Sequence, residues 1–310
     1  MVLIISDRVE ETEIEVCDWV RRLNSKCEII STVDFLNDIN IDYNNKSKNV
    51  SFFLNGIYVK SIWVRRDRFS SKNYLQNNIP KIININLDLE TDTLKEFILE
   101  KGYNNMNILS SYSNIKLNKL KVLRIASDVG LMVPDYIITN RKKTLKQFIK
   151  EHNKVISKAS YENLQFNIKS KNFFQYVEVF DKTGIKKIPN KFFPSFFQKF
   201  VPQKYEIRAF YFNGEIYAMA NILSDRLSGD IRRTGYVIRR IPYIFHQIDI
   251  EKITLLMNNL NLTIGALDFI IDYKDKVHFL EVNPNGNFLV TSKKSNYNLE
   301  EKVANYLVYG

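Results

Sequence analysis

Polar side chains interrupt an apolar hairpin near the end of the sequence. Residues 263–283, TIGALDFIIDYKDKVHFLEVN, contain two apolar runs separated by YKDK, a pattern that predicts two antiparallel strands. A loop with an even number of residues, centred on Lys274-Asp275, places Asp268 opposite Glu281. Asn283 is two residues after Glu281 and therefore lies on the same face of its strand. We expect two carboxylates and an amide oxygen on one face of this hairpin.

The opposite face has the character of a protein core, with Leu267, Phe269, Ile271, Leu280 and Val282. Two carboxylates facing each other destabilise a strand pair, and apolar neighbours make their desolvation costly. A salt bridge to Lys or Arg, a shared proton or a divalent cation would each relieve the repulsion. The additional amide oxygen favours Mg²⁺, which binds few carboxylates and completes its shell with water and substrate phosphates, over zinc.

The segments before the hairpin predict a small α/β domain over residues 1–112. An apolar run at 2–6, a helical pattern at 11–23 and a strand at 27–31 give a β-α-β opening. Asn55-Gly56 between two apolar runs predicts a further hairpin. Thr93 followed by Glu96 predicts a capping box that begins a helix at 94–101.

Residues 113–196 and 197–310 are expected to form two more domains of mixed helices and strands. Helical patterns occur at 120–129, with Gly130 as C-cap, from Thr144 with Gln147 as capping partner, at 249–260 and at 299–308. Strands are expected near 155–159 and 174–180, and strand-like alternation continues to residue 223.

Composition excludes some classes of protein and leaves others open. The chain of 310 residues exceeds the usual size of one core. Its 45 Lys and Arg against 34 Asp and Glu give a charge of +11, spread along the chain, which indicates either a soluble basic surface or a site for anions. The absence of a signal peptide and of a long apolar run predicts a cytoplasmic protein without membrane contact. No zinc-finger, helix-turn-helix or RNA-binding signature supports a nucleic-acid partner, and no P-loop, G-x-S-x-G or HExxH motif is present.

Several motifs together resemble one enzyme family. They are IWVRR (62–66), NKLKVLRIASDVGLMVP (118–134), QKFVPQKYEIRAFYFNGEIYAMA (198–220), ALDFI (266–270), FLEVNPNGNF (279–288) and NYNLE (296–300). The pattern is similar to the ATP-grasp superfamily and, within it, to the graspetide synthetases, relatives of the microviridin ligases of the "grasp-with-spasm" subgroup. This resemblance implies an α/β N-terminal domain followed by an α+β ATP-grasp fold of two lobes, with ATP and Mg²⁺ as cofactors.

The resemblance also assigns roles to individual residues. Lys119 and Lys158 match the two lysines that contact ATP phosphates. The hinge Gln198, Lys199, Phe200 and Val201 matches the segment whose backbone at 199 and 201 meets adenine, and Glu206 matches the acid near the ribose. Asp268, Glu281 and Asn283 match the magnesium ligands, in agreement with the hairpin register.

The catalytic arginines are less sharply defined by the pattern. Arg232 aligns with the family arginine near the γ-phosphate or acyl phosphate, with the adjacent Arg233 as an alternative, because the usual D-F-R-x-Y reads DIRR here. Arg208 shares a strand face with Glu206 and is either catalytic or paired with that acid. Arg239 and Arg240 indicate either a solvated loop or recognition of an acidic peptide.

The family chemistry defines the expected reaction. An Asp or Glu side chain of a ribosomal precursor peptide, made of a leader and an acidic core, is phosphorylated by ATP and then attacked by a Thr or Ser hydroxyl or a Lys amine. The products are ω-ester or ω-amide macrocycles. The alternatives are an ATP-grasp ligase for free amino acids or a protein tail, and a fold that only binds nucleotide. Sequence alone does not decide the oligomeric state, a homodimer included.

Overall fold

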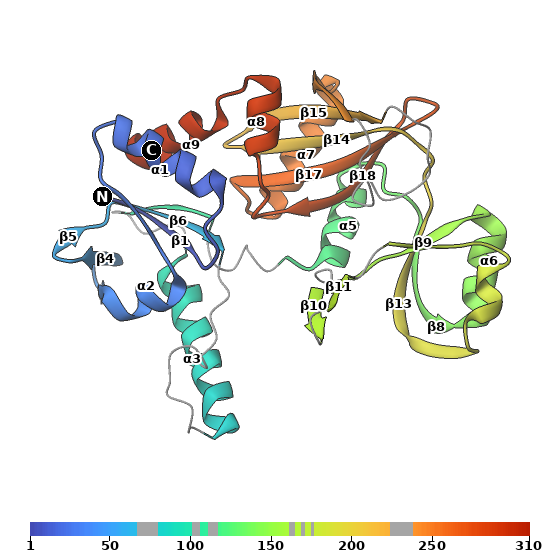
Figure 1. The fold of residues 1–310 in the computed structure, drawn as a ribbon, viewed down its shortest axis with the longest axis horizontal. Coiled ribbons are helices and arrows are strands. Elements are labelled where there is room, and N and C mark those ends of the chain that lie inside the picture. Colours follow the sequence, from blue (N-terminus) through green and yellow to red (C-terminus); the bar gives the residue numbers. More distant parts are fainter. Residues whose placement is uncertain are drawn as a thin grey trace.

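The structure is a computed structural model that describes residues 1–66, 80–100, 106–110, 117–160, 165–168, 171–174, 177–223 and 238–310. Its described strands form three main groups that follow one another along the chain, and helices pack against them (Figure 1). No helix within these ranges combines the length and the apolar content needed to cross a membrane.

The first group is a parallel sheet in the order β2-β1-β6-β7, flanked by helices. Its elements are β1 (Val2–Ser6), α1 (Glu11–Arg22), β2 (Cys27–Ile30), α2 (Thr32–Asp38), β6 (Ser61–Arg66), α3 (Lys81–Ile98) and β7 (Asn107–Leu109). The predicted β-α-β opening is therefore confirmed. Helix α2 was not predicted, although its cap, in which the Ser31 side chain accepts a hydrogen bond from Asp34 N, was present in the sequence.

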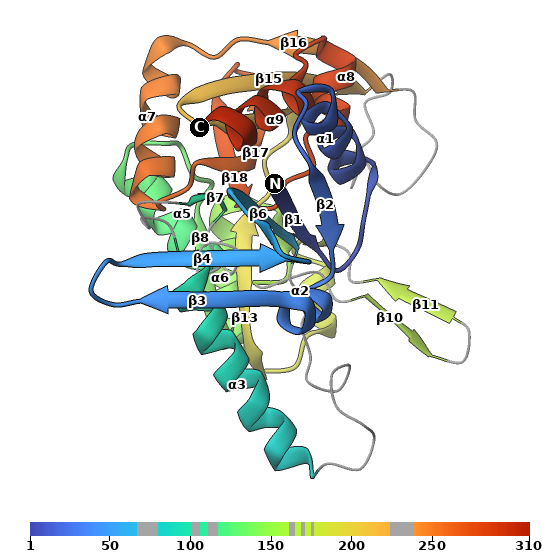
Figure 2. The same cartoon turned by 90° about the vertical axis from the view of Figure 1, so that its left-hand side faces the viewer.

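A small antiparallel sheet and the long helix α3 extend from this group (Figure 2). Strands β3 (Ile39–Asn44), β4 (Asn49–Leu54) and β5 (Ile57–Tyr58) form the sheet. Asn55 and Gly56 have φ values of 51° and 75°, the positive values that a two-residue hairpin turn requires. The capping box expected at Thr93 is wrong, because Thr93 lies inside α3 and its hydroxyl donates to Leu89 O, a bond that threonine makes within helices.

The second group is an antiparallel sheet in the order β12-β9-β13-β8. Its elements are β8 (Tyr136–Arg141), α6 (Lys142–His152), β9 (Val155–Ser157), β12 (Glu178–Phe180), η2 (Gly184–Lys187) and β13 (Lys191–Lys199), with a separate hairpin of β10 (Gln165–Ile168) and β11 (Lys171–Phe174). The helix expected to begin at Thr144 begins at Lys142 instead, and Gln147 donates to Glu151 rather than to a cap.

The third group is an antiparallel sheet in the order β16-β15-β14-β17-β18. Its strands are β14 (Gln203–Phe212), β15 (Glu215–Leu223), β16 (Ile238–Tyr243), β17 (Ile264–Asp272) and β18 (Val277–Asn283). Alternate residues such as Leu267, Phe269 and Ile271 form a buried core with α5 (Lys119–Asp128) and α7 (Gln247–Asn259). The other face of the sheet is left to line a cavity.

Two helices carry the end of the chain back to its beginning (Figure 1). Helix α8 (Leu289–Ser295) follows β18, and α9 (Leu299–Tyr309) packs against α1. Val16 and Val20 of α1 share a hydrophobic core with Val303 and Leu307 of α9. Packing thus attaches the C-terminal helix to the N-terminal sheet.

Candidate active site

Strands β17 and β18 bring Asp268 and Glu281 opposite each other, as predicted. The loop between them does not have the expected even number of residues, because Asp272 N donates to Lys276 O and leaves three residues between. Near the turn the pairing is consequently displaced by one residue, with Ile271 opposite Val277. Leu280 has no partner in β17 and forms a bulge that restores the predicted pairing.

The bulge also corrects one assignment of faces. Leu280, expected in the core, is partly buried and lines the cavity. Phe279 takes the core position and is fully buried. The correct pairing of the two carboxylates therefore depends on two local irregularities that compensate each other.

A cavity of about 570 Å³ lies between the sheet of the third group and the sheet of the second group. The predicted site residues that line it are Lys119, Lys158, Gln198, Lys199, Phe200, Val201, Glu206, Arg208, Asp268 and Glu281. Residues from three strands, a helix N-terminus, the hinge and the position after β9, all far apart in sequence, thus meet at one place.

Charged groups alternate along one end of the cavity. Arg208 pairs with Asp268 across β14 and β17, and its Nη1 lies 2.7 and 2.6 Å from the two carboxylate oxygens. Lys119 Nζ lies 3.4 Å from Glu281 Oε2. Each carboxylate therefore has its own cation, as in the salt-bridge alternative, and Asp268 is an ion-pair partner of Arg208. The Asp268 and Glu281 side chains remain 30% and 31% exposed and are accessible to a ligand.

Lys158 adds a third cation at this end. Burial lowers the pKa of its ammonium group, with Lys119 acting in the same direction and Glu281 opposing it. Burial by itself would raise the pKa of the Glu281 carboxyl, but Lys158 and Lys119 outweigh it, and the pKa is lowered. Three cations against two carboxylates favour a bound anion here.

The hinge forms the other end of the cavity, and its backbone is partly used by the fold. Lys199 N donates to Asp135 O at 2.8 Å, and Phe200 N donates to Lys154 O at 3.1 Å. Any contact of Lys199 with a base would therefore use its carbonyl oxygen. This end contains the apolar residues Val201, in the hinge, and Ile156, which pairs with Gln198, and the cavity is also lined by Ile270, Leu280 and Val290.

Two buried amide groups at the hinge lack hydrogen-bond partners in the part of the chain that the structure describes. They are the acceptor Oε1 of Gln198, whose Nε2 donates to Pro134 O, and the donor Nε2 of Gln203. Buried polar groups without partners are rare in folded proteins. An unpaired acceptor and an unpaired donor in an apolar pocket suit the polar edge of a heterocyclic base. Gln203 was not predicted from the sequence.

Glu206 begins a second row of polar residues across the sheet. It pairs with Asn221 of β15, which pairs in turn with Arg240 of β16, and all three residues line the cavity. Arg239 is exposed, whereas Arg240 is partly buried. Asn221 was not predicted, and Arg232 and Arg233 lie outside the described residues.

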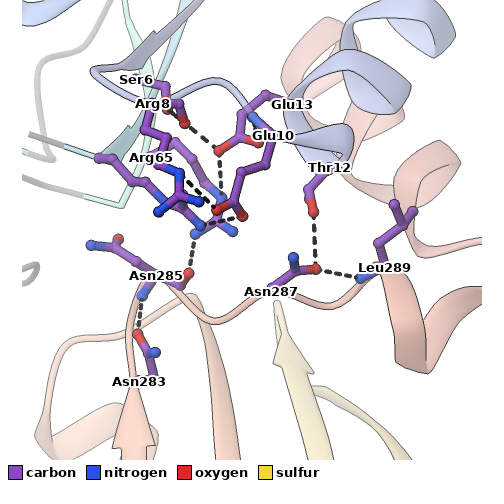
Figure 3. A network of polar contacts seen from close by, with 11 residues as sticks. Ser6, Arg8, Glu10, Thr12, Glu13, Arg65, Asn283, Asn285, Asn287 and Leu289 are labelled. Atoms are coloured by element: carbon purple, nitrogen blue, oxygen red, sulfur yellow. Dashed lines mark hydrogen bonds and ion pairs between the residues drawn. The ribbon is translucent and has the colours of Figure 1, made fainter. Parts of the chain in front are cut away.

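Asn283 is not among the residues that line the cavity. It pairs with Ala266, is exposed, and its Oδ1 accepts a hydrogen bond from Asn285 N at 3.0 Å (Figure 3). Asn287 lines the cavity instead, and its Oδ1 accepts hydrogen bonds from Thr12 and from Leu289 N. The donor set for a divalent cation thus consists of two adjacent carboxylates, with Asn283 two residues further along β18.

Comparison with solved structures identifies the fold. The macrocyclase MdnC from Microcystis aeruginosa MRC, bound with precursor peptide MdnA, superimposes with a TM-score of 0.78 at 20% identity over 100% of this chain and 99% of that one. The RiPP-associated ATP-grasp ligase of Chryseobacterium gregarium, in complex with ADP and a leader and core peptide, gives 0.80 at 18% identity over 99% and 96%. The ATP-grasp ligase PsnB, complexed with a phosphomimetic variant of its minimal precursor, Mg and ADP, gives 0.75 at 14% over 99% and 97%.

These likenesses cover the whole chain and establish an ATP-grasp fold. No protein-family model matches the sequence, and no curated protein matches it either.

Proposed function

We propose that this protein is an ATP-dependent ligase that joins Asp or Glu side chains of a ribosomal precursor peptide to Thr or Ser hydroxyls or Lys amines of the same peptide. The observation that carries the proposal is the charged row Arg208, Asp268, Glu281 and Lys119, with Lys158 beside it, at one end of a cavity whose other end is apolar. That division matches the phosphate and base ends of a nucleotide.

The apolar end would hold adenine. Val201, Ile156 and Ile270 supply the walls, and the unpaired Gln198 Oε1 can accept a hydrogen bond from the exocyclic amine. The Lys199 carbonyl and the Val201 amide are the backbone groups assigned to the base. Glu206, on the strand that follows the hinge, would accept hydrogen bonds from the ribose hydroxyls.

The charged end would hold the phosphates and magnesium. Lys119 and Lys158 are point charges suited to phosphate oxygens, and their attraction to a polyphosphate would replace their attraction to Glu281. Asp268, Glu281 and Asn283 are the proposed ligands of Mg²⁺, a hard cation that oxygen donors of this kind fit. When bound, Mg²⁺ neutralises charge that develops on the phosphates.

The reaction needs positioning more than a protein nucleophile. A carboxylate oxygen of the peptide forms a bond to the γ-phosphorus as the bond to the ADP oxygen breaks, giving an acyl phosphate. A hydroxyl or amine of the same peptide then attacks the acyl carbon and releases phosphate, with net loss of one water from the peptide. Arg208, or Arg232 and Arg233, would stabilise the negative charge on the transferred group.

Two observations support a peptide as the substrate. The structural neighbours include a macrocyclase and two ligases that were each bound with a precursor peptide. Arg240 also brings a further positive charge to the cavity wall, beyond Asn221, where it could receive a carboxylate. A ligase for free amino acids or protein tails is the alternative.

Mass spectrometry with an ADP assay tests the proposal directly. The protein is incubated with ATP, Mg²⁺ and a candidate peptide that carries a leader and an acidic, Thr-rich core. We expect ADP release together with loss of about 18 Da per ring, the mass of one water that acyl transfer removes. A product of higher mass would show intermolecular ligation, and the absence of ADP with any acceptor would refute both enzyme functions.

The variant Glu281→Gln tests the assignment of Glu281 as a metal ligand. It keeps the size of the side chain but removes one charge from the proposed metal site, and we expect it to lose turnover while its circular dichroism and melting temperature stay close to wild type. Retained turnover would disprove the metal assignment.

A further inference from the structure

The N-terminal domain contacts the segment that joins β18 to α8, residues 283–289 (Figure 3). This segment begins two residues after Glu281 and contains Asn287, which lines the cavity. Two contacts from separate elements of the N-terminal domain hold it.

The first contact is made by Arg65 at the end of β6. Arg65 Nη1 donates a hydrogen bond to Asn285 O, and the arginine is 1% exposed. Glu13 of α1, which is fully buried, balances the charge, with its Oε1 3.3 Å from Arg65 Nε. The Arg65 guanidinium also lies over the Trp63 ring, at 5.6 Å from its centroid. A buried cation of this kind is costly unless it is paired, and Glu13 and Asn285 O are the partners of Arg65 here.

The second contact is made by Thr12 in the first turn of α1. Thr12 is fully buried, and its Oγ1 donates to Asn287 Oδ1 at 3.0 Å. The same oxygen of Asn287 accepts a hydrogen bond from Leu289 N, the first residue of α8, at 3.0 Å. Thr12 therefore orients a side chain of the cavity wall from outside the cavity.

The opposite side of the segment is seated directly on β17. A Cβ at Gly286 would lie 2.0 Å from Ala266 Cβ and 2.8 Å from Ala266 N. Ala266 is two residues from Asp268 in the same strand. The segment is thus held between the strand that carries one proposed metal ligand and the N-terminal domain.

We infer that Thr12 and Arg65 are positioning residues, which fix residues 283–289 from the N-terminal domain and thereby shape the phosphate end of the cavity. Only the identity of the ligand in this inference rests on the proposed function. The N-terminal domain is accordingly part of the active site without contributing a side chain to the cavity surface at these two positions.

Amide hydrogen exchange in the full-length, ligand-free protein tests whether Thr12 and Arg65 fix residues 283–289. In Thr12→Val, which keeps the shape but removes the hydroxyl, we expect exchange of residues 283–289 to be about fivefold faster, the effect of losing one buried hydrogen bond. Thr12→Ser keeps the hydroxyl and should restore the slow exchange. Arg65→Lys keeps the charge beside Glu13 but not the reach to Asn285, and should also speed exchange.

Thr32→Val is the matched control. Thr32 is also a buried threonine in a first helical turn of the N-terminal domain, but its hydroxyl donates to Asp7 at 2.9 Å, away from the segment. It should leave exchange of 283–289 unchanged. Unaltered exchange in Thr12→Val and Arg65→Lys would overturn the inference.

Calorimetric titration with Mg-ATP tests whether fixing this segment shapes the phosphate end of the cavity. We expect Thr12→Val to bind Mg-ATP about fivefold more weakly, by the same loss of one hydrogen bond, and Thr12→Ser and Thr32→Val to bind like wild type. Faster exchange with unchanged affinity would overturn the positioning role. If the wild-type protein itself does not bind Mg-ATP, the proposed function and the role toward nucleotide both fail, which is distinct from a failure confined to the Thr12 variant.

Discussion

Lys158 illustrates how the site depends on the environment of single side chains. It follows the short strand β9 and lies near Glu281, Asp268 and Lys119, and burial lowers its pKa. Lys119 and Arg208 are each paired with a carboxylate at 3.4 Å or less. A polyphosphate would therefore compete with these ion pairs for Lys119 and Arg208, whereas Lys158 would gain a partner that offsets its desolvation.

Replacement of Lys158 by Met should weaken Mg-ATP binding 10- to 100-fold, because a hydrogen bond to a charged group contributes about 1.5 to 3 kcal/mol. Wild-type affinity should also fall as pH rises through the lowered pKa of Lys158, since the ammonium then loses its charge. Affinity measured by calorimetry should lose this pH dependence in Lys158→Met.

Lys121 provides the control for that variant. It is exposed on α5, two residues after Lys119, so Lys121→Met should bind Mg-ATP like wild type. Equal affinity of Lys158→Met and wild type would exclude Lys158 from the phosphate site.

At the scale of elements, the hairpin β17–β18 determines the geometry of the carboxylates. Its turn is fixed by Asp272, whose Oδ1 accepts hydrogen bonds from Lys274 N and Lys276 N at 2.8 and 3.0 Å, and whose Oδ2 is 2.9 Å from His278 Nε2. Burial would raise the pKa of Asp272, but these hydrogen bonds lower it to about 2. The turn therefore sets where the three-residue loop begins and, with the bulge at Leu280, which residues face the cavity.

Substitution of Asp272 by Asn should lower the free energy of unfolding at pH 6 by about 1.5 kcal/mol, because it weakens the hydrogen bonds that Lys274 N and Lys276 N donate to the charged carboxylate. The folded-state pKa lies below the ordinary value of 3.8, so this stabilisation is present above about pH 4 and is lost as pH falls toward 2. Urea unfolding at pH 6 and pH 3 should therefore show a smaller loss on acidification in the variant than in wild type. Asp275→Asn, at an exposed ion pair with Lys204, should change little, and the same acid dependence in both variants would contradict the role of Asp272.

At the scale of the whole molecule, α1 connects the N-terminal parallel sheet to the C-terminal helices α8 and α9. One face of α1 packs on α9. Its first turns contact α8, where Lys293 pairs with Glu11 and Glu15 at 2.7 and 2.8 Å, and the segment 283–289, where Asn287 accepts a hydrogen bond from Thr12. The buried pair Glu13 and Arg65 lies at the centre of this junction (Figure 3). Burial lowers the pKa of Arg65 to about 10 although Glu13 opposes the shift, so the arginine stays charged at neutral pH.

The single variant Arg65→Met should cost about 3 to 5 kcal/mol in the free energy of unfolding, because it leaves the Glu13 charge buried and uncompensated. The double variant Glu13→Gln with Arg65→Met removes both charges and should recover part of that loss, measured by chemical denaturation. Glu13→Gln is also measured alone. If the losses of free energy of unfolding in the two single variants add up to the loss in the double variant, the two residues are not coupled.

Much of the fold could be predicted because local patterns and tertiary structure agree. The β-α-β opening, the Asn55-Gly56 turn and helices α5, α7 and α9 follow from apolar periodicity and capping residues. The capping boxes at Thr93 and Thr144 failed because the same residue types also bond within a helix. Short elements such as α2 and α8 were missed because seven residues give little periodicity.

The sequence by itself predicted that Asp268 and Glu281 face each other, and its resemblance to a known family predicted roles for the lysines 119 and 158. Tertiary structure decided what each of them faces. The three-residue loop and the bulge at Leu280 each displace the strand pairing by one residue, and the two displacements cancel to give the predicted pairing. Arg208 pairs with Asp268. Gln203 and Asn287 line the cavity, although no local pattern in the sequence indicates it. Local patterns encode strands and turns through adjacent residues. Contacts such as Thr12 to Asn287, 275 residues apart, arise only when the whole chain packs.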